Sequence, residues 1–288
     1  MTYLCGKVQS RLQMRQRTVA AYLLIILAAV SFRTCQAQEI RFREIDRASV
    51  ERWLGEAPAD NAQRKRKLES YFDTAGCQAG LSEQPVKRQR LPNIVCKLPG
   101  TDDSMILVGA HFDHVIMGRG VADNWSGAVL LPLLYESFSS RPRKHAFVFV
   151  AFTAEEQGLV GSRYYAKQMS AEDVAKTRAM VNLDTLGLSP TKVWASRADK
   201  HLLELLIRVA ASMKLSLQGV NVERVGSTDA ESFARLKIPR IAIHSITQET
   251  LPILHSPRDT LAALNLSDYY DTYRLVAAYL AYLDQVLE

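Results

Sequence analysis

The stretch Phe147–Gly158 reads FVFVAFTAEEQG and joins an apolar run to two adjacent acidic residues, Glu155 and Glu156. An uninterrupted run of Val, Phe and Ala is typical of a strand that is covered on both faces, as in α/β proteins. Two neighbouring carboxylates repel each other, so their place directly after a buried strand suggests that another group balances their charge. The same arrangement recurs after other apolar runs of the chain.

Apolar runs with strand character alternate with helical patterns from residue 93 onward. Several runs, such as Met105–Ala110 (MILVGA), are apolar throughout, which is expected when helices cover both faces of a sheet. The alternation predicts an α/β fold, namely a three-layer α/β/α domain with a mostly parallel or mixed central sheet. The predicted strands are Asn93–Leu98, Met105–Ala110, Ala146–Phe152, Ala179–Leu183, Lys192–Ala195 and Arg240–His244. The helical patterns cover about 46–55, 60–75, 125–138, 158–168, 171–178, 200–214, 229–236 and 267–287.

The composition is that of an ordinary globular protein, with 288 residues, 48% of them hydrophobic and 23% charged. The net charge of +6 arises almost wholly from residues 1–37, which contain five basic residues and no acidic one. The rest of the chain has 31 basic and 30 acidic residues. This balance gives no indication of a nucleic-acid partner.

Residues 1–37 have the layout of a secretory signal peptide. Basic residues precede the uncharged stretch Val19–Phe32, and small residues follow near Cys35. The apolar stretch is shorter than the roughly 20 residues of a membrane span, so an uncleaved N-terminal anchor is the second interpretation. We expect a secreted or periplasmic protein with this leader, a helical extension over 38–90 packed on the domain, and the main domain over 91–288.

Cys77 and Cys96 are the two cysteines beyond the leader. Disulfides persist in oxidising compartments, so an exported protein allows a bond between them. Such a bond would stabilise the fold by roughly 3 kcal/mol. Two separate buried thiols are the alternative interpretation.

Ionisable side chains follow several of the predicted strands. His111 and Asp113 come directly after MILVGA, and Asp184 follows AMVNL. The carboxyl ends of parallel strands meet at one edge of a sheet, where functional groups collect. Carboxylates and imidazoles gathered there need a counter-charge, and a mixed His/Asp/Glu set suits zinc. The candidate residues are His111, Asp113, Asp123, Glu155, Glu156, Asp184 and His255.

Two of these candidates have ordinary alternative interpretations. Asp123 precedes a predicted helix, where an aspartate is usually an N-cap. His255 lies in a predicted loop before the last helix, and alone it would more often be a surface or capping residue than a ligand. These two residues indicate a site only in combination with the others.

Five short motifs together resemble the M28 zinc exopeptidases, the family of the bacterial leucyl aminopeptidases. They are HFDH (111–114), VADNWSG (121–127), AEEQGLVGS (154–162), NLDTLG (182–187) and LHSPRDT (254–260). They occur in the family's order and approximate spacing, each at the end of a predicted element. The resemblance covers the chain from about Asn93 to the C-terminus. The family fold, a mixed sheet between helices, agrees with the fold that the strand pattern predicts.

The resemblance implies two zinc ions per chain. His111 and Asp184 would hold one ion. Glu156 and His255 would hold the other, and Asp123 would bridge the two with its two carboxylate oxygens. Three carboxylate ligands and one hydroxide would then offset the charge of the two cations.

The resemblance also implies roles for two further acidic residues. Asp113 matches the family's acid that orients the ligand His111 and raises its basicity. Glu155 matches the general base, which would take a proton from a metal-bridging water and pass it to the leaving amine.

The implied function is that of a secreted aminopeptidase with peptide substrates, no nucleic-acid partner and no membrane contact beyond an N-terminal anchor. Carboxypeptidase or dipeptidase action on the same scaffold stays open. A glutaminyl-peptide cyclotransferase, which has a related fold and needs one zinc, is the main alternative, although the peptidase-like QGLVGS follows Glu156. A binding domain that has lost its metals is a third, which the complete ligand set disfavours. The sequence does not indicate an oligomeric state.

Two further segments bear on the substrate pocket. Gly226–Phe233 (GSTDAESF) resembles a family loop near that pocket, but Ala230 stands where the family often has His. The segment Leu251–Leu254 would either line a side-chain pocket or form a buried hinge.

The remaining histidines are expected to have structural roles. We expect His114 beside the ligands or in the pocket wall, and His244 in the core with hydrogen-bond partners. We expect His145 and His201 on the surface or on helices.

Overall fold

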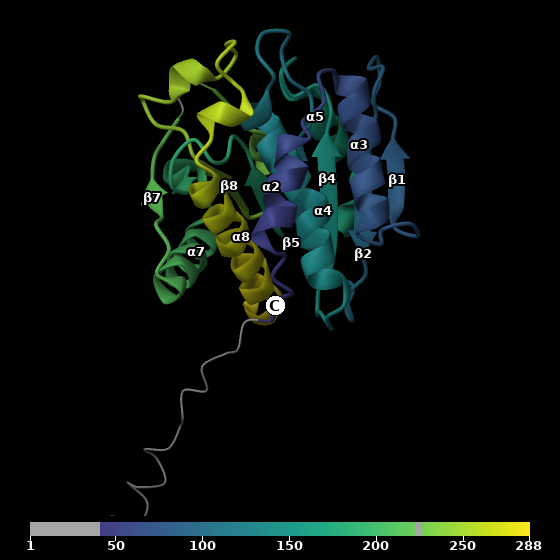
Figure 1. Cartoon of the computed structure of the whole chain (residues 1–288). Helices are drawn as coiled ribbons and strands as arrows, with labels where there is room; N and C mark the ends of the chain where they lie inside the picture. The colour runs from purple at the N-terminus through teal and green to yellow at the C-terminus, as the bar shows by residue number, and fades with distance from the viewer. Residues whose placement is uncertain (1–40, 223–225) are drawn as a thin grey trace, which may run out of the picture. The chain divides into compact units, whose positions relative to one another are not determined.

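The structure is a computed structural model that describes residues 41–222 and 226–288. These residues fold around one mixed β-sheet (Figure 1). Its strands lie in the order β1-β2-β4-β3-β5-β8-β6-β7. The strands are β1 (Leu81–Gln84), β2 (Asn93–Leu98), β3 (Met105–His111), β4 (Ala146–Phe152), β5 (Thr177–Leu183), β6 (Lys192–Val193), β7 (Gln218–Gly219) and β8 (Arg240–His244). Neighbours among β4, β3, β5 and β8 are parallel, so the carboxyl ends of these four strands share one edge of the sheet.

Antiparallel pairs complete the sheet on both sides. β2 runs antiparallel to β4, and β1 runs antiparallel to β2. On the other side β6 runs antiparallel to β8, while β7 is parallel to β6. A mixed sheet with a parallel centre confirms the predicted fold class.

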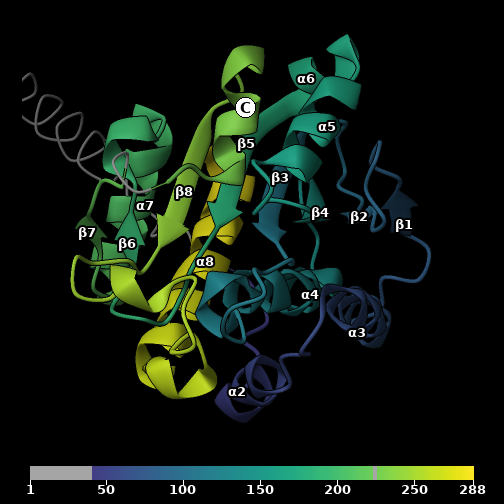
Figure 2. The same ribbon diagram turned by 90° about the horizontal axis from the view of Figure 1, so that it is seen from above.

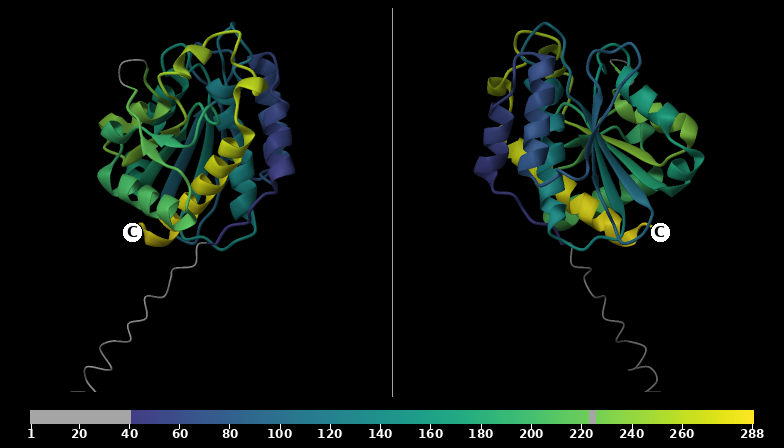
Figure 3. Two further views of the ribbon diagram at one scale, coloured as in Figure 1. Left: turned by 60° about the vertical axis from the view of Figure 1, so that its left-hand side comes forward. Right: turned by 90° about the vertical axis from the view of Figure 1, so that its right-hand side faces the viewer.

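Helices form a layer on each face of the sheet. They are α2 (Arg47–Gly55), α3 (Asn61–Thr74), α4 (Ser126–Ser139), α5 (Val160–Gln168), α6 (Ala171–Lys176), α7 (Lys200–Met213) and α8 (Leu266–Val286). Helices α2, α3, α4, α7 and α8 pack into one apolar cluster with the sheet. The opposite face packs against α5, α6 and the 3-10 helix Asp229–Leu236 (Figures 2 and 3).

The central strands are apolar throughout because alternate side chains enter opposite layers. In β4, Phe147 and Phe149 belong to one buried cluster, whereas Val148 and Val150 belong to the other. A strand with both faces buried has no polar face, which explains the uninterrupted apolar runs of the sequence.

The observed elements differ from the predicted ones at a few places. β1 and β7 are not predicted, because β1 (LSEQ) is mostly polar and β7 (QG) has only two residues. β1 lies within 38–90, where only helices are predicted. The predicted strand Lys192–Ala195 ends at Val193, and a 3-10 turn follows at Ala195–Arg197. The segment Asp229–Leu236 is a 3-10 helix rather than the predicted α-helix.

Aspartate caps define the starts of both helices in the extension. The Asp46 side chain accepts a hydrogen bond from the backbone of Ser49 in α2. Asp60 likewise accepts one from the backbone of Gln63 in α3. The two helices contact each other through Trp53 and Tyr71, whose stacked rings have centroids 4.1 Å apart.

Cys77 and Cys96 form a disulfide. The bond confirms the predicted pairing and rules out two separate thiols. Because Cys77 closely follows α3 and Cys96 lies in β2, it joins the extension to the sheet. Both cysteines are fully buried.

The predicted leader, residues 1–37, lies outside the described residues, so the signal peptide and the anchor stay predictions. Among the described helices, none combines the length and the apolar character that crossing a bilayer requires.

Candidate metal centre

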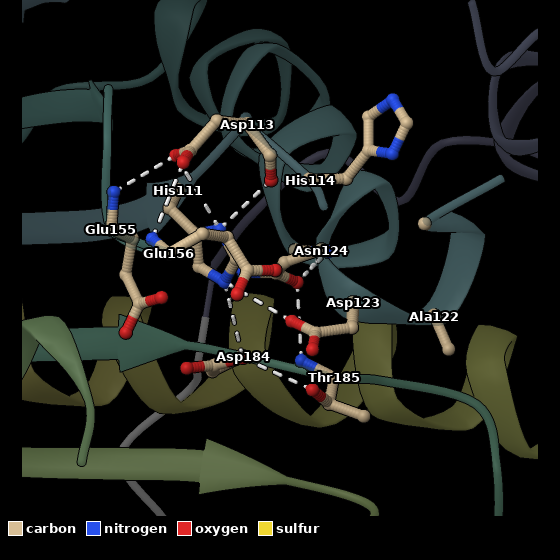
Figure 4. Close-up of polar contacts among 12 residues, drawn as sticks. His111, Asp113, His114, Ala122, Asp123, Asn124, Glu155, Glu156, Asp184 and Thr185 are labelled. Atoms are coloured by element: carbon tan, nitrogen blue, oxygen red, sulfur yellow. Dashed lines mark hydrogen bonds and ion pairs between the residues drawn. The ribbon is translucent and has the colours of Figure 1, made fainter. Parts of the chain in front are cut away.

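The predicted site residues lie at the carboxyl edge of the parallel strands, and Figure 4 labels all of them except His255. Because β3, β4 and β5 are parallel and adjacent, their last residues bring distant parts of the sequence together. The residues lie at the end of β3 (His111), after β4 (Glu155 and Glu156), after β5 (Asp184) and in the loop before α8 (His255). Asp123 lies in the segment Val121–Trp125 before α4, where its own backbone angles are not helical.

His111, Asp123 and Asp184 form a first group. His111 Nε2 lies 3.2 Å from Asp123 Oδ1 and 3.6 Å from Asp184 Oδ1. The three residues are buried, and the ligand atoms lie within 4.8 Å of one another. The hydroxyl of Thr185 donates to Asp184 Oδ1 over 3.1 Å and so restrains that carboxylate. One imidazole and two carboxylates at this spacing make a candidate site for a divalent cation.

Asp123, Glu156 and His255 form a second group. His255 Nε2 lies 3.1 Å from Asp123 Oδ2 and 2.9 Å from Glu156 Oε2. These ligand atoms also lie within 4.8 Å of one another. Asp123 therefore turns Oδ1 toward the first group and Oδ2 toward the second. This is the arrangement expected of a carboxylate that bridges two cations.

The charges of the two groups fit the binding of cations. Burial, followed by the negative charge of Asp123, raises the pKa of Glu156 to about 7. Glu156 Oε1 is buried and receives no hydrogen bond from any described residue. Burial alone would lower the pKa of His111, but the surrounding carboxylates, Glu155 first, raise it well above its usual value. Divalent cations would satisfy these oxygens, and the mixed nitrogen and oxygen donors suit zinc.

Glu155 lies beside the two groups and belongs to neither. Burial is the main cause that raises its pKa to about 9, and the negative charges of Asp229 and Asp184 add to the effect against the opposing charge of His111. Figure 4 shows the side chains of Glu155 and Glu156 leaving the backbone in different directions. Glu155 thus has a carboxyl group that can accept and release a proton, as a general base must.

Asp113 fixes the backbone of the acidic pair. Its carboxylate oxygens accept hydrogen bonds from the backbone N–H groups of Glu155, over 3.0 Å, and Glu156, over 3.3 Å. Its Oδ1 lies 3.7 Å from His111 Nδ1, whereas its backbone carbonyl lies closer to that nitrogen, at 3.1 Å. A proton on Nδ1 shared with this carbonyl leaves Nε2 of His111 free for a metal ion.

Asn124 holds the Asp123 segment against the end of β5. Its Oδ1 accepts a hydrogen bond from the backbone N–H of Thr185 over 3.1 Å, and its Nδ2 donates to the carbonyl of Leu183 over 2.9 Å. The peptide bond between Asp123 and Asn124 is cis. The sequence contains Asn124 in the motif VADNWSG, but no pattern shows that its side chain bonds to another strand.

Asp259 holds the same segment from the other side. Its two oxygens accept hydrogen bonds from the backbone N–H groups of Ala122, over 2.6 Å, and Asp123, over 3.1 Å. Asp259 is itself buried, and burial is the first cause of its raised pKa. Only its place in LHSPRDT, four residues after His255, could have drawn attention to it.

A pocket of about 270 Å³ opens beside the two groups. Apolar side chains form part of its wall, namely Val222, Ala242, Ile246, Leu251 and Leu254. The sequence leaves the segment Leu251–Leu254 open to two interpretations, a pocket wall or a buried hinge. Leu251 and Leu254 line the pocket, so the first interpretation applies to these two residues. Among the described residues, no Lys or Arg lines this pocket. Its described lining therefore offers apolar surface and acidic side chains, without a Lys or Arg side chain among the described residues that would pair with a carboxylate.

The loop Gly226–Phe233 borders this pocket through its first residues, Gly226 to Thr228. Ala230, which stands where the resembling family often has His, is buried in the second apolar cluster. Asp229 is fully buried, and burial is the main cause that raises its pKa to about 7. The loop therefore contributes backbone and small polar groups to the pocket rim.

His244 lines the pocket with both ring nitrogens engaged. Nε2 lies 3.0 Å from the carbonyl of Val220, and Nδ1 accepts a hydrogen bond from the backbone N–H of Ile246 over 3.1 Å. This confirms the predicted hydrogen-bonded histidine in the core.

Two other histidines differ from expectation. His114 is not among the residues that line the pocket; its ring turns toward the extension, with Nε2 3.2 Å from the carbonyl of Ala59 (Figure 4). The predicted surface place of His145 is wrong, because this residue is fully buried before β4. His201 is exposed on α7, as predicted.

Comparison with known proteins assigns the family. The profile described as "Peptidase family M28" matches residues 93–280, a range that includes both metal-ligand groups and Glu155. The chain belongs to peptidase family M28. This match confirms the resemblance to the M28 family that the five sequence motifs indicate.

Relatives and solved structures agree with this assignment. Leupeptin-inactivating enzyme 1 of Streptomyces exfoliatus is 39% identical over 151 residues, which cover 51% of the M28 chain and 34% of that enzyme. A zinc aminopeptidase from Bacillus subtilis has a similar structure, with a TM-score of 0.62 at 23% identity, covering 70% of the M28 chain and 52% of that chain. A glutaminyl cyclase from an Acidobacteriales bacterium has a similar fold, with a TM-score of 0.70 at 17% identity. The match covers 87% of the M28 chain and 98% of that chain. The M28 chain spans about a third of the length of the first curated relatives, 34% and 36%.

Proposed function

We propose that this M28 chain is a secreted aminopeptidase that binds two zinc ions and releases N-terminal residues from peptides. The observation that carries the proposal is the geometry of Asp123. Its two oxygens face two separate groups of ligands, at 3.2 Å from His111 Nε2 and 3.1 Å from His255 Nε2. Asp184 would complete the first site and Glu156 the second. Two bound zinc ions would supply Lewis-acid activation of the scissile carbonyl and of a water molecule.

Glu155 would move the proton in this reaction. It lines the pocket next to both groups, and its carboxyl is a ligand in neither. It would take a proton from the attacking water and deliver it to the leaving amine. Asp113 would keep Glu155 in place, because it accepts a hydrogen bond from the Glu155 backbone over 3.0 Å.

The pocket favours the amino end of a peptide over the carboxyl end. A free α-ammonium group would be attracted by the carboxylate of Glu155, which lines the pocket and is not among the proposed metal ligands. The carboxylate of a C-terminal residue would be repelled by Glu155, and the described lining residues include no Lys or Arg to pair with it. The apolar wall, which includes Leu251 and Leu254, would accept an apolar side chain of the first residue.

Export to an oxidising compartment is part of the proposal. Two features support it: the signal-like stretch before residue 38, which lies outside the described residues, and the disulfide between Cys77 and Cys96.

Product analysis with four related peptides tests the activity. A peptide with an apolar first residue and a free amino group should lose that residue, and amidation of its C-terminus should leave the rate unchanged. Acetylation of the amino group should abolish cleavage. A peptide shortened from its carboxyl end instead would reject the aminopeptidase assignment in favour of a carboxypeptidase.

A glutaminyl-peptide cyclotransferase is the second candidate. The observation in its favour is that Asp123, Glu156 and His255 alone form a complete set of ligands for one zinc ion. The fourth peptide, which begins with Gln, discriminates between the two. An aminopeptidase releases free Gln, whereas a cyclotransferase releases ammonia and leaves the peptide at its full number of residues.

A further inference from the structure

Arg64 is a buried cation that comes from the extension and not from the sheet that carries the site. It lies on α3 with none of its surface exposed. Nη1 donates to the carbonyl of Phe112 over 3.1 Å, and Nη2 donates to the carbonyl of Gly120 over 2.9 Å. Nη2 also donates to the carbonyl of Arg119, and Nε reaches the carbonyl of Pro58 over 3.3 Å.

Three of the four carbonyls that Arg64 binds belong to the two segments that present metal ligands, and the fourth, that of Pro58, belongs to the extension itself. Phe112 lies between His111 and Asp113 in the chain, and Gly120 lies three residues before Asp123. One planar guanidinium group thus connects the end of β3 with the turn that leads to the bridging carboxylate. A guanidinium has five N–H donors in a fixed plane, so it can hold two backbone segments in one relative orientation.

The surroundings of Arg64 maintain its charge. Burial lowers its pKa to about 10, while the carboxylates of Asp259, Asp113 and Asp123 act in the opposite direction. The guanidinium carbon lies 5.6 Å from the ring centroid of Trp125, where a cation is attracted to the ring face. Arg64 stays positive at neutral pH and donates its hydrogen bonds to carbonyl oxygens, so the nearby carboxylates keep their oxygens for metal ions.

Neighbouring contacts attach the same part of the extension to the same loop. Asn61 Oδ1 accepts a hydrogen bond from the backbone N–H of His114 over 3.1 Å, and Asn61 Nδ2 donates to the His114 carbonyl over 3.3 Å. Arg119 Nη2 donates to the carbonyl of Ala57 over 2.9 Å. Arg64 is therefore the buried centre of a polar interface between residues 57–64 and 112–120.

We propose that Arg64 is a positioning residue for the metal centre, and that the extension is required for tight metal binding because Arg64 sets the relative place of His111 and Asp123. This inference rests on the proposed zinc centre. The extension would then act on the site through the backbone of residues 112–120, in addition to covering the apolar core.

Zinc affinity tests the inference without relying on catalysis. The full chain is stripped of metal and titrated with zinc in competition with a chelating dye, for the wild type, Arg64→Met and Arg64→Lys. We expect zinc affinity to fall about 10- to 100-fold in Arg64→Met, as for other groups that orient metal ligands. Arg64→Lys keeps the charge but cannot bind the Phe112 and Gly120 carbonyls with one planar group, so we expect an intermediate loss.

Leu68→Ala is the matched control. Leu68 lies four residues further along α3, is fully buried in the apolar cluster, and has no polar group that could hold a site loop. We expect this variant to lower the midpoint of urea unfolding and to keep the zinc affinity of the wild type. Equal losses of zinc affinity in Leu68→Ala and Arg64→Met would reduce Arg64 to a stabilising residue and overturn the inference.

The remaining outcomes separate this inference from the proposed function. If Arg64→Lys binds zinc as tightly as the wild type, the inference is overturned. This outcome decides the matter even if Arg64→Met does not fold. If neither Arg64 variant folds, Asn61→Ala serves instead, because it removes the adjacent contact with His114. Unchanged zinc affinity in Asn61→Ala would reject positioning by the extension. A wild-type chain that binds no zinc contradicts the proposed function itself, whereas a zinc-binding wild type with unaffected variants contradicts the role of Arg64 alone.

Discussion

Histidine and aspartate side chains gather at both ends of the parallel strands β3 and β4. At the amino ends, Ser104 precedes β3 and the buried His145 precedes β4. His145 Nε2 lies 3.1 Å from the carbonyl of Leu287, and its Nδ1 contacts the Ser104 hydroxyl. Asp284 accepts hydrogen bonds from the backbone N–H groups of His145, over 2.8 Å, and the preceding Lys144, over 3.1 Å.

The carboxyl ends of the same strands differ in how their charges are compensated. There His111 lies between two aspartates, and Glu156 shares His255 with Asp123. Burial, as the first cause, raises the pKa of Glu155 and of Glu156, and neighbouring carboxylates add to the effect in both cases. Burial lowers the pKa of His145, whereas surrounding carboxylates raise the pKa of His111.

The comparison shows that residue types alone do not mark a functional site. Both ends of the strands bury His and Asp, but hydrogen bonds account for the polar groups at the amino ends. Only the carboxyl ends leave several acidic groups without sufficient compensation. Natural folds retain such an arrangement where a cation or a reaction requires it.

The largest effect is expected from removing the bridging charge. In Asp123→Asn, one ligand is lost from both groups at once, so we expect peptidase activity to fall to background and both zinc ions to bind far more weakly. Zinc content after dialysis, measured together with peptide cleavage, checks this. A variant that keeps two zinc ions would show that Asp123 is not shared.

Glu155→Gln should remove activity without removing metal. The amide cannot accept the proton of the attacking water, so we expect kcat to fall by about 10²- to 10⁴-fold. Zinc content should equal that of the wild type, because Glu155 belongs to neither ligand group. Loss of zinc in this variant would assign Glu155 to the ligands instead.

Asp284→Ala tests the amino ends of the strands. It deprives two backbone N–H groups of their acceptor, so we expect the free energy of unfolding to fall by about 1–3 kcal/mol. Urea unfolding measures this change. Because the site lies at the other end of the strands, kcat/KM and zinc content should match the wild type, and a change in either would contradict the division between the two ends.

The pH dependence of the metal-free protein tests the unbalanced charge at Glu155 alone. Glu155 has its pKa raised from 4.5 to about 9 in the fold, so between these values the native state holds a proton that the unfolded chain has released. The free energy of unfolding therefore falls as pH rises through this window. Thermal unfolding across the window should show a shallower decline in Glu155→Gln. If stability declines equally with pH in the wild type and in Glu155→Gln, then a group other than Glu155 takes up the proton.

The sequence predicts most of the sheet and most of the site for a physical reason. Strands buried on both faces must be apolar throughout, so runs such as Met105–Ala110 reveal them directly. Ionisable residues after such strands are exceptional enough to attract attention, as with Glu155 and Glu156. The polar strand β1 lacks this signature and is visible only through its pairing with β2.

Residues that act through backbone atoms are harder to predict. Asn124, Asp259 and Arg64 hold loops by bonds to peptide groups, and their partners are separated from them by many residues. No periodicity or spacing encodes such contacts, because they depend on how distant loops meet in the fold. The buried place of His145 is not visible in the sequence for the same reason, since its partners Asp284 and Leu287 lie at the far end of the chain.

Zinc stoichiometry of the wild-type chain tests the central claim most directly. Metal-free protein is titrated with zinc, and the bound ions are counted by native mass spectrometry. The shared position of Asp123 between His111 and His255 predicts saturation at two ions per chain, with neither ion retained tightly in Asp123→Asn. Saturation at one ion, or no binding at all, would contradict a centre in which the unbalanced carboxylates hold a pair of metals.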